Sequence, residues 1–393
     1  MLASGATISV ADIVRSVRAV VGDGASVGLH EPTFKGAEWT YVKECLDTGW
    51  VSTAGAYVGR FETALCEHCE AKNAVAVVSG TAALHAALLI AGVKPGDEVI
   101  VPSLTFAATA NAVVHCGAIP HFVDSNWESL GIDAGRLDDY LHEIVRMEGQ
   151  TAFNRLTGRP LRAIVPVHVF GHSVDLDALE DVAGRFNLAL IEDATEALGS
   201  RYRGRAVGGG SRLAVLSFNG NKIVTTGGGG AILTNDADTA KHIRHMTTTA
   251  KLPHRWAFEH DAAGYNYRMP NINAALGVAQ LEQLEGFVEK KRRLAERYQA
   301  IFAGQDGVSV FHEASYCRSN YWLNALILDE AMTPYRDHLL TAFHAAGLQA
   351  RPVWRLLHEL PHFSTAPRMR TPVADDIQRR IVNLPSSPHL VTA

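Results

Sequence analysis

Short apolar runs alternate with helical patterns between residues 74 and 235 of this chain. Most of these runs are rich in Val, Ile and Ala and are apolar on both faces, which is typical of strands covered by helices on both sides. Helical patterns such as Ala82–Ala91 and Asp177–Phe186 lie between them. The alternation predicts an α/β domain with a mostly parallel, seven-stranded sheet flanked by helices. The predicted strands are Ala74–Ser79, Glu98–Ser103, Ile119–Asp124, Ala163–Val169, Leu188–Asp193, Leu213–Phe218 and Gly230–Thr234.

The two ends of the chain carry different patterns. Apolar residues at helical spacing predict an amphipathic helix over Val10–Val21, within an N-terminal extension of residues 1–29. Residues 30–273 then form the large domain, and a long helical pattern over residues 274–303 predicts a bridge to a smaller α+β C-terminal domain. This last segment, residues 274–393, is predicted to contain a strand at Trp322–Leu328 and helices at Tyr335–Ala346 and Ala374–Val382.

Composition narrows the class of protein. Hydrophobic residues make up 47% and charged residues 20% of the 393 residues, which fits a globular protein and argues against disorder. The formal net charge is -5 and no basic block stands out, so we expect no nucleic-acid partner. We find neither a secretory signal pattern nor an apolar run of the roughly 20 residues that a membrane span needs. The sequence therefore predicts a cytoplasmic protein with no membrane partner.

Cysteine, histidine and glycine patterns argue against other kinds of site. The five cysteines are odd in number and widely spaced, which favours a reducing compartment over a disulfide framework. Cys66 and Cys69 form a lone CxxC, and the 18 histidines include no His-Glu-x-x-His pattern. We therefore expect no metal site. No Walker lysine follows Gly227–Gly230, so this segment is not a P-loop.

Polar residues follow several predicted strands, at the edge of the sheet where ligands bind in parallel α/β domains. Ser79-Gly80-Thr81 opens a helix, whose free backbone N–H groups can bind an anion. A helix cap without a ligand explains the same residues. Asp193 ends another strand and can bind a metal, act as a base, pair with a protonated ring nitrogen or cap a helix.

Two further strand ends carry a lysine and an aromatic ring. Lys222 lies on a Gly-flanked loop five residues after Ser217, where it can form a Schiff base with an aldehyde. The usual alternative is a surface lysine, but the neighbouring hydroxyl and the glycines at Gly227–Gly230 favour a backbone that approaches a ligand. Phe106 can stack on a flat cofactor or belong to the core.

Together these segments resemble a known family. In their order along the chain, Ser79-Gly80-Thr81, Glu192-Asp193-Ala194, Ser217-Phe218-Asn219 and Lys222 are similar to fold-type I, pyridoxal-phosphate-dependent nucleotide-sugar aminotransferases of the DegT type. The resemblance extends over about residues 30–303. Further matching segments are Gly49–Thr53 with Phe61-Glu62, Lys94–Val99 and Gly264–Met269.

The resemblance implies pyridoxal 5′-phosphate as the cofactor, with pyridoxamine 5′-phosphate as its amine form. Lys222 would carry the cofactor as a Schiff base and act as general base and acid, and Asp193 would pair with the protonated pyridine nitrogen. The other implied cofactor contacts are Gly80, Thr81 and Ser217 at the phosphate, Asn266 of the partner subunit at the same phosphate, Phe106 against the ring, Asn219, and Glu196 where relatives often have Gln or His near the ring hydroxyl.

The resemblance also implies substrates and a partner. His30-Glu31-Pro32, Tyr41–Trp50, Asn320–Asn324 and Asn383–Ser387 are similar to a narrower branch that acts on UDP-linked 4-keto-6-deoxy-N-acetylhexosamines. This branch implies transfer of the amino group of L-glutamate to C4 of the sugar, with release of 2-oxoglutarate, for surface-glycan biosynthesis. The implied enzyme is a homodimer with shared active sites. The implied substrate contacts are Thr53, Gly55 and Tyr321.

Other functions on the same fold are alternatives. The sugar can instead be a 3-keto sugar or a GDP- or TDP-linked one. A sugar dehydratase of this fold replaces the lysine with histidine, so Lys222 disfavours it. A non-catalytic sensor that binds pyridoxal phosphate is a further alternative, and formation of 2-oxoglutarate from glutamate would separate an enzyme from it.

Overall fold

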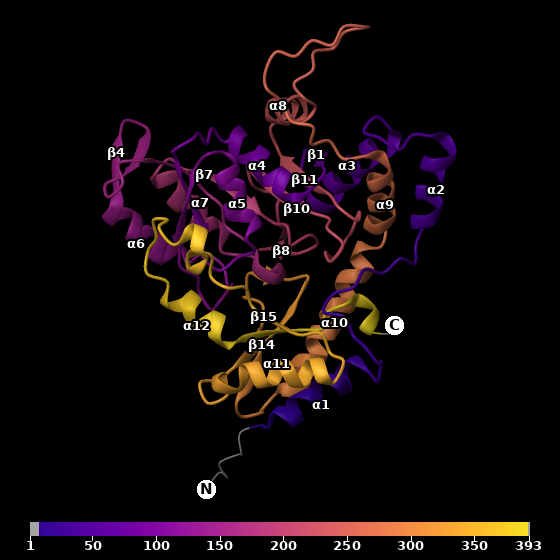
Figure 1. Ribbon diagram of the computed structural model, residues 1–393, viewed down its shortest axis with the longest axis vertical. Helices are drawn as coiled ribbons and strands as arrows, with labels where there is room; N and C mark the ends of the chain where they lie inside the picture. The colour runs from indigo at the N-terminus through magenta and orange to yellow at the C-terminus, as the bar shows by residue number, and fades with distance from the viewer. Residues whose placement is uncertain (1–7, 392–393) are drawn as a thin grey trace.

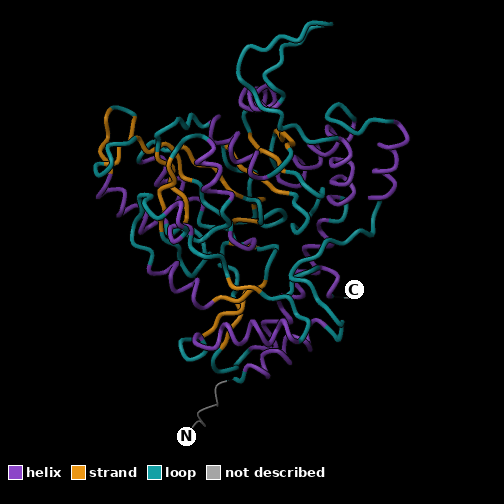
Figure 2. The backbone as a smooth tube through the Cα atoms, viewed as in Figure 1, coloured by secondary structure: helices purple, strands orange, loops and turns teal. Residues whose placement is uncertain are grey.

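The large domain is built on one sheet. The computed structural model describes residues 8–391 (Figures 1 and 2). In it, seven strands follow the order β1-β11-β10-β7-β6-β2-β3. β11 is antiparallel to both of its neighbours, whereas the strands from β10 to β3 are parallel. The predicted, mostly parallel sheet is therefore confirmed. The strands are β1 (Asn73–Val77), β2 (Glu98–Pro102), β3 (Ile119–Val123), β6 (Pro160–Ile164), β7 (Ala189–Asp193), β10 (Leu213–Ser217) and β11 (Gly230–Thr234).

Two features of the sheet differ from the prediction. β4 (Val145–Glu148) and β5 (Thr151–Asn154) form a hairpin that pairs with β6 and enlarges the sheet to nine strands. Three of the four residues of β4 are exposed, so no apolar run marks it. β6 ends at Ile164 instead of Val169, and Pro166, which lacks a backbone N–H, lies just beyond it.

Alternate residues of the strands face two separate apolar cores. In β1, Ala74 and Ala76 belong to one core, whereas Val75 and Val77 belong to the other. Helices therefore cover both faces of the sheet, as the apolar strands predicted. On one face lie α3 (Ala56–Cys69), α6 (Ala134–Ile144), α7 (Leu176–Arg185) and α9 (Asn271–Leu281). On the other face lie α4 (Gly80–Ile90), α5 (Ala108–His115) and α8 (Ala237–Thr247).

A four-stranded sheet with the order β12-β14-β16-β15 forms the smaller domain. Its core also contains residues from the start of the chain, because Ile13 and Val17 pack with Leu294 and Phe343. The predicted helix α1 (Val10–Val21) is confirmed and packs against α10 and α11. The elements of this domain are α10 (Leu284–Phe302), β12 (Val308–Val310), β14 (Asn324–Leu328), α11 (Arg336–Ala345), β15 (Arg351–Pro352), α12 (Pro372–Arg380) and β16 (Ile381–Leu384).

The helical pattern of residues 274–303 forms two helices, α9 and α10, which meet at Glu282 and Gln283. The domain boundaries that we predicted from the sequence stay predictions. Within residues 8–391, no helix is both long and apolar enough to cross a membrane. The remaining elements are α2 (Glu38–Thr48), β8 (Arg201–Tyr202), β9 (Arg205–Ala206), β13 (Cys317–Arg318) and the 3-10 helices η1 (Val169–Gly171), η2 (Thr333–Tyr335), η3 (Leu357–Glu359), η4 (Pro361–Phe363) and η5 (Pro388–Leu390).

Candidate active site

A cavity of about 510 Å³ opens where the carboxyl ends of the large-domain strands face the smaller domain. Its large-domain wall contains eight of the predicted site residues. Residues from the start of the chain, the two residues just before β14, and residues of β15 and β16 contribute to the opposite wall. The large-domain residues in question are Gly80, Thr81, Phe106, Asp193, Glu196, Ser217, Asn219 and Lys222.

Lys222 extends into this cavity from the turn that follows β10. Only 13% of its side chain is exposed, so it is not a surface lysine. Its Nζ lies 3.4 Å from Oε1 of Glu196 and 3.9 Å from the centroid of the Trp322 ring. The Trp322 indole is itself fixed by a 2.8 Å hydrogen bond from its Nε1 to the carbonyl of Asn221. The amine is thus held between a carboxylate and an aromatic face.

Asp193, the last residue of β7, supplies a second carboxylate to the cavity. It is 2% exposed. Its Oδ2 accepts a 2.8 Å hydrogen bond from Oγ1 of Thr109, and its Oδ1 accepts a 3.3 Å hydrogen bond from the backbone N–H of Thr195. Both bonds fix the direction of the carboxyl group. This geometry suits a carboxylate that pairs with a protonated ring nitrogen.

The anion site predicted at the start of α4 also faces the cavity. Ser79 caps the helix, because its Oγ accepts a hydrogen bond from the N–H of Ala82. Backbone packing is tight here. A Cβ on Gly80 would lie 2.9 Å from Cβ of Ser217, and one on Gly230 would lie 2.4 Å from the carbonyl oxygen of Ser79. The helix N-terminus, with hydroxyls on both sides, forms a cradle that fits a phosphate group.

Glu196, whose Oε1 lies 3.4 Å from Nζ of Lys222, is 4% exposed. Its Oε2 accepts a 2.9 Å hydrogen bond from the backbone N–H of Phe170, which has a φ of 55°. Burial raises the pKa of the Glu196 carboxyl, and the nearby Lys222 amine opposes this shift only in part. The Glu196 carboxyl therefore retains its proton to a higher pH than an exposed carboxyl does.

Phe106 lies at the edge of the cavity, and 59% of its surface is exposed. It follows β2 and is not part of the apolar core, so the core interpretation of this ring is wrong. An exposed ring beside Asp193 and Thr109 is available to stack on a flat ligand.

Four predicted contacts do not line the cavity of their own chain. Thr53 and Gly55 lie before α3, where Gly55 packs against Asn271. Asn266 forms a bridge with Thr248 outside the cavity. Tyr321 does not reach the cavity, contrary to the expected substrate contact. It is 4% exposed, and its hydroxyl accepts hydrogen bonds from Gln299 and from the N–H of Glu313. Its neighbour Trp322 lines the cavity in its place.

The sequence did not single out several cavity residues. Thr109, which orients Asp193, is the second residue of α5, where a threonine is unremarkable. Trp322 and His30 belong to segments that carried the family resemblance, but nothing local indicated that they face Lys222. Arg351 and Asn383 pair on neighbouring strands of the smaller domain. The four residues Trp322, His30, Arg351 and Asn383 come together only through the tertiary fold.

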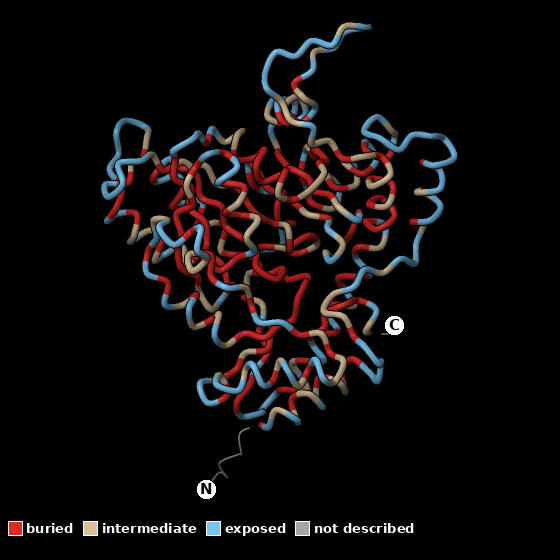
Figure 3. Tube along the Cα trace, in the orientation of Figure 1, coloured by how far each residue is buried: buried red, intermediate tan, exposed pale blue. Residues whose placement is uncertain are grey.

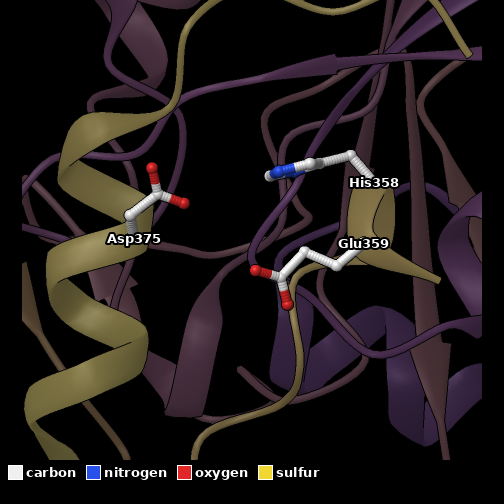
Figure 4. A group of neighbouring side chains, drawn as sticks. All are labelled: His358, Glu359 and Asp375. Carbon is white, nitrogen blue, oxygen red and sulfur yellow. The ribbon is translucent and has the colours of Figure 1, made fainter. Parts of the chain in front are cut away.

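A separate group of titratable residues joins η3 to α12. Ligand-type atoms of His358, Glu359 and Asp375 lie within 4.8 Å of one another (Figure 4). The Nδ1 of His358 lies 2.6 Å from Oγ of Ser103. Glu359 accepts hydrogen bonds from Arg355 and from Gln378 of α12. The protein's own donors thus occupy Glu359, and the cluster fastens α12 to the large domain.

A family model described as the DegT/DnrJ/EryC1/StrS aminotransferase family matches residues 32–393. The chain belongs to this family. Aminotransferases of this family depend on pyridoxal phosphate, and the cavity fits that cofactor. It combines a buried lysine, a fixed carboxylate and a phosphate cradle that a side chain on Gly80 would disturb. The chain is therefore a pyridoxal-phosphate-dependent aminotransferase related to those of sugar metabolism.

Individual relatives agree with this assignment. The chain is 37% identical over 374 residues to GDP-perosamine synthase of Caulobacter vibrioides, covering 95% of this chain and 96% of the relative. It is 35% identical to the putative pyridoxal phosphate-dependent aminotransferase EpsN of Bacillus subtilis, over 92% of this chain and 91% of EpsN. Helicobacter pylori PseC, an aminotransferase involved in the biosynthesis of pseudoaminic acid, superposes with a TM-score of 0.82. It is 25% identical and covers 92% of this chain and 93% of PseC.

Proposed function

We propose that this enzyme transfers the amino group of L-glutamate to C4 of a nucleotide-linked 4-keto-6-deoxy sugar. The observation that carries the proposal is the position of Lys222, which lies between Glu196 and Trp322 at the centre of the cavity. The relatives support the substrate class, because one of them is GDP-perosamine synthase of Caulobacter vibrioides, whose name denotes a GDP-linked amino sugar. Glutamate as donor comes from the family resemblance.

The chain supplies proton transfer and orientation. Bound pyridoxal phosphate supplies the electron sink and carries the amino group between the two substrates. Lys222 would hold the cofactor, and its Nζ, once released, is placed to accept a proton from the donor substrate and to return it as general base and acid. Oε1 of Glu196 lies 3.4 Å from Nζ of Lys222, so Glu196 is placed to accept a proton from this amine and to return it. Asp193, whose direction is fixed by Thr109, would pair with the ring nitrogen of the cofactor and favour its protonated form.

The enzyme is proposed to act as a homodimer with shared active sites. The segment that follows α8 extends away from the body of the chain and is exposed along most of its length (Figures 1 and 3). It carries Trp256 and Phe258, whose side chains are 74% and 80% exposed. Such apolar side chains favour burial against a partner. Asn266 lies at the end of this segment, so a partner subunit's copy of it can reach the phosphate cradle.

Sedimentation of the active enzyme tests this assembly. We expect a dimer in which Trp256→Ser with Phe258→Ser weakens association and lowers activity per chain, because each cavity loses the partner's contribution. An active monomer at assay concentration would contradict the shared-site proposal.

Two observations point to different nucleotides on the sugar substrate. The resemblance in the segments around His30 and Asn383 favours a UDP-linked N-acetylhexosamine, whereas relatives named GDP-perosamine synthase favour a GDP-linked sugar. The test is incubation with glutamate and a panel of UDP-, GDP- and TDP-linked 4-keto and 3-keto sugars, followed by mass spectrometry. We expect an amine on a 4-keto-6-deoxy sugar. Amination of 3-keto sugars alone would refute the C4 assignment, and absence of 2-oxoglutarate formation from glutamate would favour the sensor.

A further inference from the structure

Lys291 lies on α10 and is completely buried, although lysine is among the residues least often found inside a protein. Its amine donates a 3.0 Å hydrogen bond to the carbonyl of Trp322 and a second hydrogen bond to the carbonyl of Ser386. Burial lowers the pKa of this amine well below its usual value. A neutral amine has two N–H groups, and the two carbonyls pair with both. The amine therefore acts as a fixed pair of hydrogen-bond donors.

The two carbonyls belong to neighbouring segments of the smaller domain. Trp322 lies two residues before β14, and Ser386 lies two residues after β16, the antiparallel neighbour of β14. One amine of α10 therefore joins the two segments where one enters the sheet and the other leaves it. Trp322 lines the cavity and, with His30, Arg351 and Asn383, forms its small-domain wall.

Trp322 is held at both of its backbone groups and at its indole. Its N–H donates a 2.7 Å hydrogen bond to Oδ1 of Asn320, and its Nε1 donates the 2.8 Å bond to the carbonyl of Asn221. Asn320 in turn donates a 2.9 Å bond from Nδ2 to the carbonyl of Glu196. The bond from α10 to the Trp322 carbonyl completes this set. The ring is therefore fixed relative to the residues that flank the reactive amine.

The face of the Trp322 ring lies 3.9 Å from Nζ of Lys222. An aromatic face attracts an ammonium group, so the ring restricts where this amine can lie and favours the form that holds a proton. Proton transfer depends strongly on such placement, and a shift of about 1 Å can slow a reaction about 100-fold. A change in α10 that moves the ring should therefore reach the reacting amine, although α10 itself does not line the cavity.

We infer that Lys291 is a positioning residue of this enzyme, whose buried amine fixes the place of Lys222 through Trp322. This inference rests on the proposed role of Lys222 in proton transfer. Lys291 itself exchanges no proton with the substrate. Without its two N–H groups, the carbonyls of Trp322 and Ser386 would lose a buried partner, and the ring would be free to move away from Lys222.

The first test is Lys291→Met, which keeps an unbranched side chain and removes both donors. Single-turnover formation of 2-oxoglutarate is measured with glutamate and with glutamate deuterated at C2. We expect the rate constant to fall about 10- to 100-fold, because the amine is misplaced, while the glutamate concentration at half-maximal rate stays nearly the same. Deuterium should slow the variant clearly, because proton transfer is the impaired step. A loss of rate without any isotope effect would overturn the inference.

Tyr298 provides a matched control on the same helix. It is also completely buried, and its hydroxyl donates a 3.0 Å hydrogen bond to the carbonyl of Pro385, the residue before Ser386. Tyr298→Phe should lower the unfolding temperature, as Lys291→Met does, and leave the rate constant for glutamate unchanged. An equal loss of rate in Tyr298→Phe and Lys291→Met would overturn the inference, because the effect would then come from a loosened α10.

A second substitution, Lys291→Gln, guards against misfolding of Lys291→Met. Its amide keeps two N–H groups but is one bond shorter than the lysine side chain, so it holds the carbonyl of Trp322 less well. We expect a smaller loss of rate with the same isotope effect. A loss no larger than that of Tyr298→Phe would overturn the inference.

Trp322→Leu tests whether Lys291 acts through the ring. This variant should slow the half-reaction with glutamate at least as much as Lys291→Met does. Adding Lys291→Met to Trp322→Leu should then slow the reaction by less than about twofold further, because the two changes remove one and the same effect. Losses that multiply in the double variant would show that the two residues act independently and would overturn the inference.

A measurement without the cofactor separates this inference from the proposed function. The rate at which acetic anhydride acetylates Lys222 in the cofactor-free protein is followed by mass spectrometry of its peptide. We expect acetylation to be about threefold faster or more in Lys291→Met and Trp322→Leu, because the ring no longer favours the ammonium form, and unchanged in Tyr298→Phe. Equal rates in all four proteins would overturn the inference. A natural enzyme that forms no 2-oxoglutarate from glutamate would instead contradict the proposed function.

Discussion

The two walls of the cavity satisfy their polar groups in opposite ways. On the large-domain wall, the carboxylates of Asp193 and Glu196 accept hydrogen bonds from Thr109 and Phe170, so their geometry is complete without a ligand. On the small-domain wall, Oδ1 of Asn383 and the ring of His30 have no partner in the described structure. A pre-formed wall suits a cofactor that stays bound, whereas a wall with unsatisfied groups suits a substrate that comes and goes.

The largest effect should come from the large-domain wall. Lys222→Ala removes the amine that we propose binds the cofactor covalently and moves the proton, so both half-reactions should be lost. We expect kcat to fall by at least about 10⁴-fold, the upper range for a general acid–base group, together with the visible absorbance of the lysine-bound cofactor. Absorbance and stopped-flow measurements with glutamate check this. Retention of both signals in the purified variant would refute the role of Lys222.

A change on the small-domain wall should have a smaller and more selective effect. Arg351 lines the cavity, and its guanidinium makes no ion pair with any residue from 8 to 391. A free guanidinium suits the diphosphate of the nucleotide. Arg351→Ala should therefore raise KM for the nucleotide sugar about tenfold, the effect of one charged hydrogen bond, and leave the KM for glutamate unchanged. Steady-state kinetics in which only the glutamate KM rises would contradict this assignment.

The smallest expected effect is on stability. Because burial raises the pKa of Glu196 above its unfolded value, the folded state binds this proton more tightly. The stability that it contributes is fully present below the usual value of 4.5 and is lost as pH rises through the folded pKa. Glu196→Gln should therefore unfold at a higher temperature than the natural protein at pH 8, by about 2–4 °C for each kcal/mol gained.

The difference in unfolding temperature between Glu196→Gln and the natural protein should shrink as the pH falls toward 4.5. Thermal unfolding of the cofactor-free proteins across this pH range measures it, with Asp139→Asn, at an exposed position of α6, as a control that should show no such trend. A variant that is less stable at pH 8 would show that the pair with Lys222 outweighs the burial of Glu196.

Much of the large domain could be predicted because its strands are buried on both faces. Runs such as Ala74–Ser79 and Leu213–Phe218 are apolar except for one serine each, and polar residues at or after the ends of the strands, including Asp193 and Lys222, mark one edge of the sheet. Local sequence was sufficient there because each functional residue lies next to its own strand. The exposed hairpin β4–β5 lacks such a run, and for that reason the sequence did not predict it.

The small-domain wall could not be predicted in the same way. His30, Trp322, Arg351 and Asn383 come from four segments, and no local motif joins them. The pairing of Arg351 with Asn383 depends on the register of β15 and β16, which are only two and four residues long. Tyr321 shows the same difficulty. The sequence suggested that it contacts the substrate, but its backbone has a φ of 47°, and Trp322 lines the cavity instead.

The close approach of Gly80 to Ser217 has a consequence for how such an enzyme can change over time. Even one added methyl group at position 80 would collide with Ser217, five residues before the lysine, and displace the loop that carries it. Nearly every substitution of Gly80 should therefore be eliminated by selection. His30 and Asn383 hold no internal bond through their buried polar atoms, so they can be exchanged without undoing the scaffold. Related enzymes can therefore change their sugar specificity while the residues around Lys222 keep the same reaction.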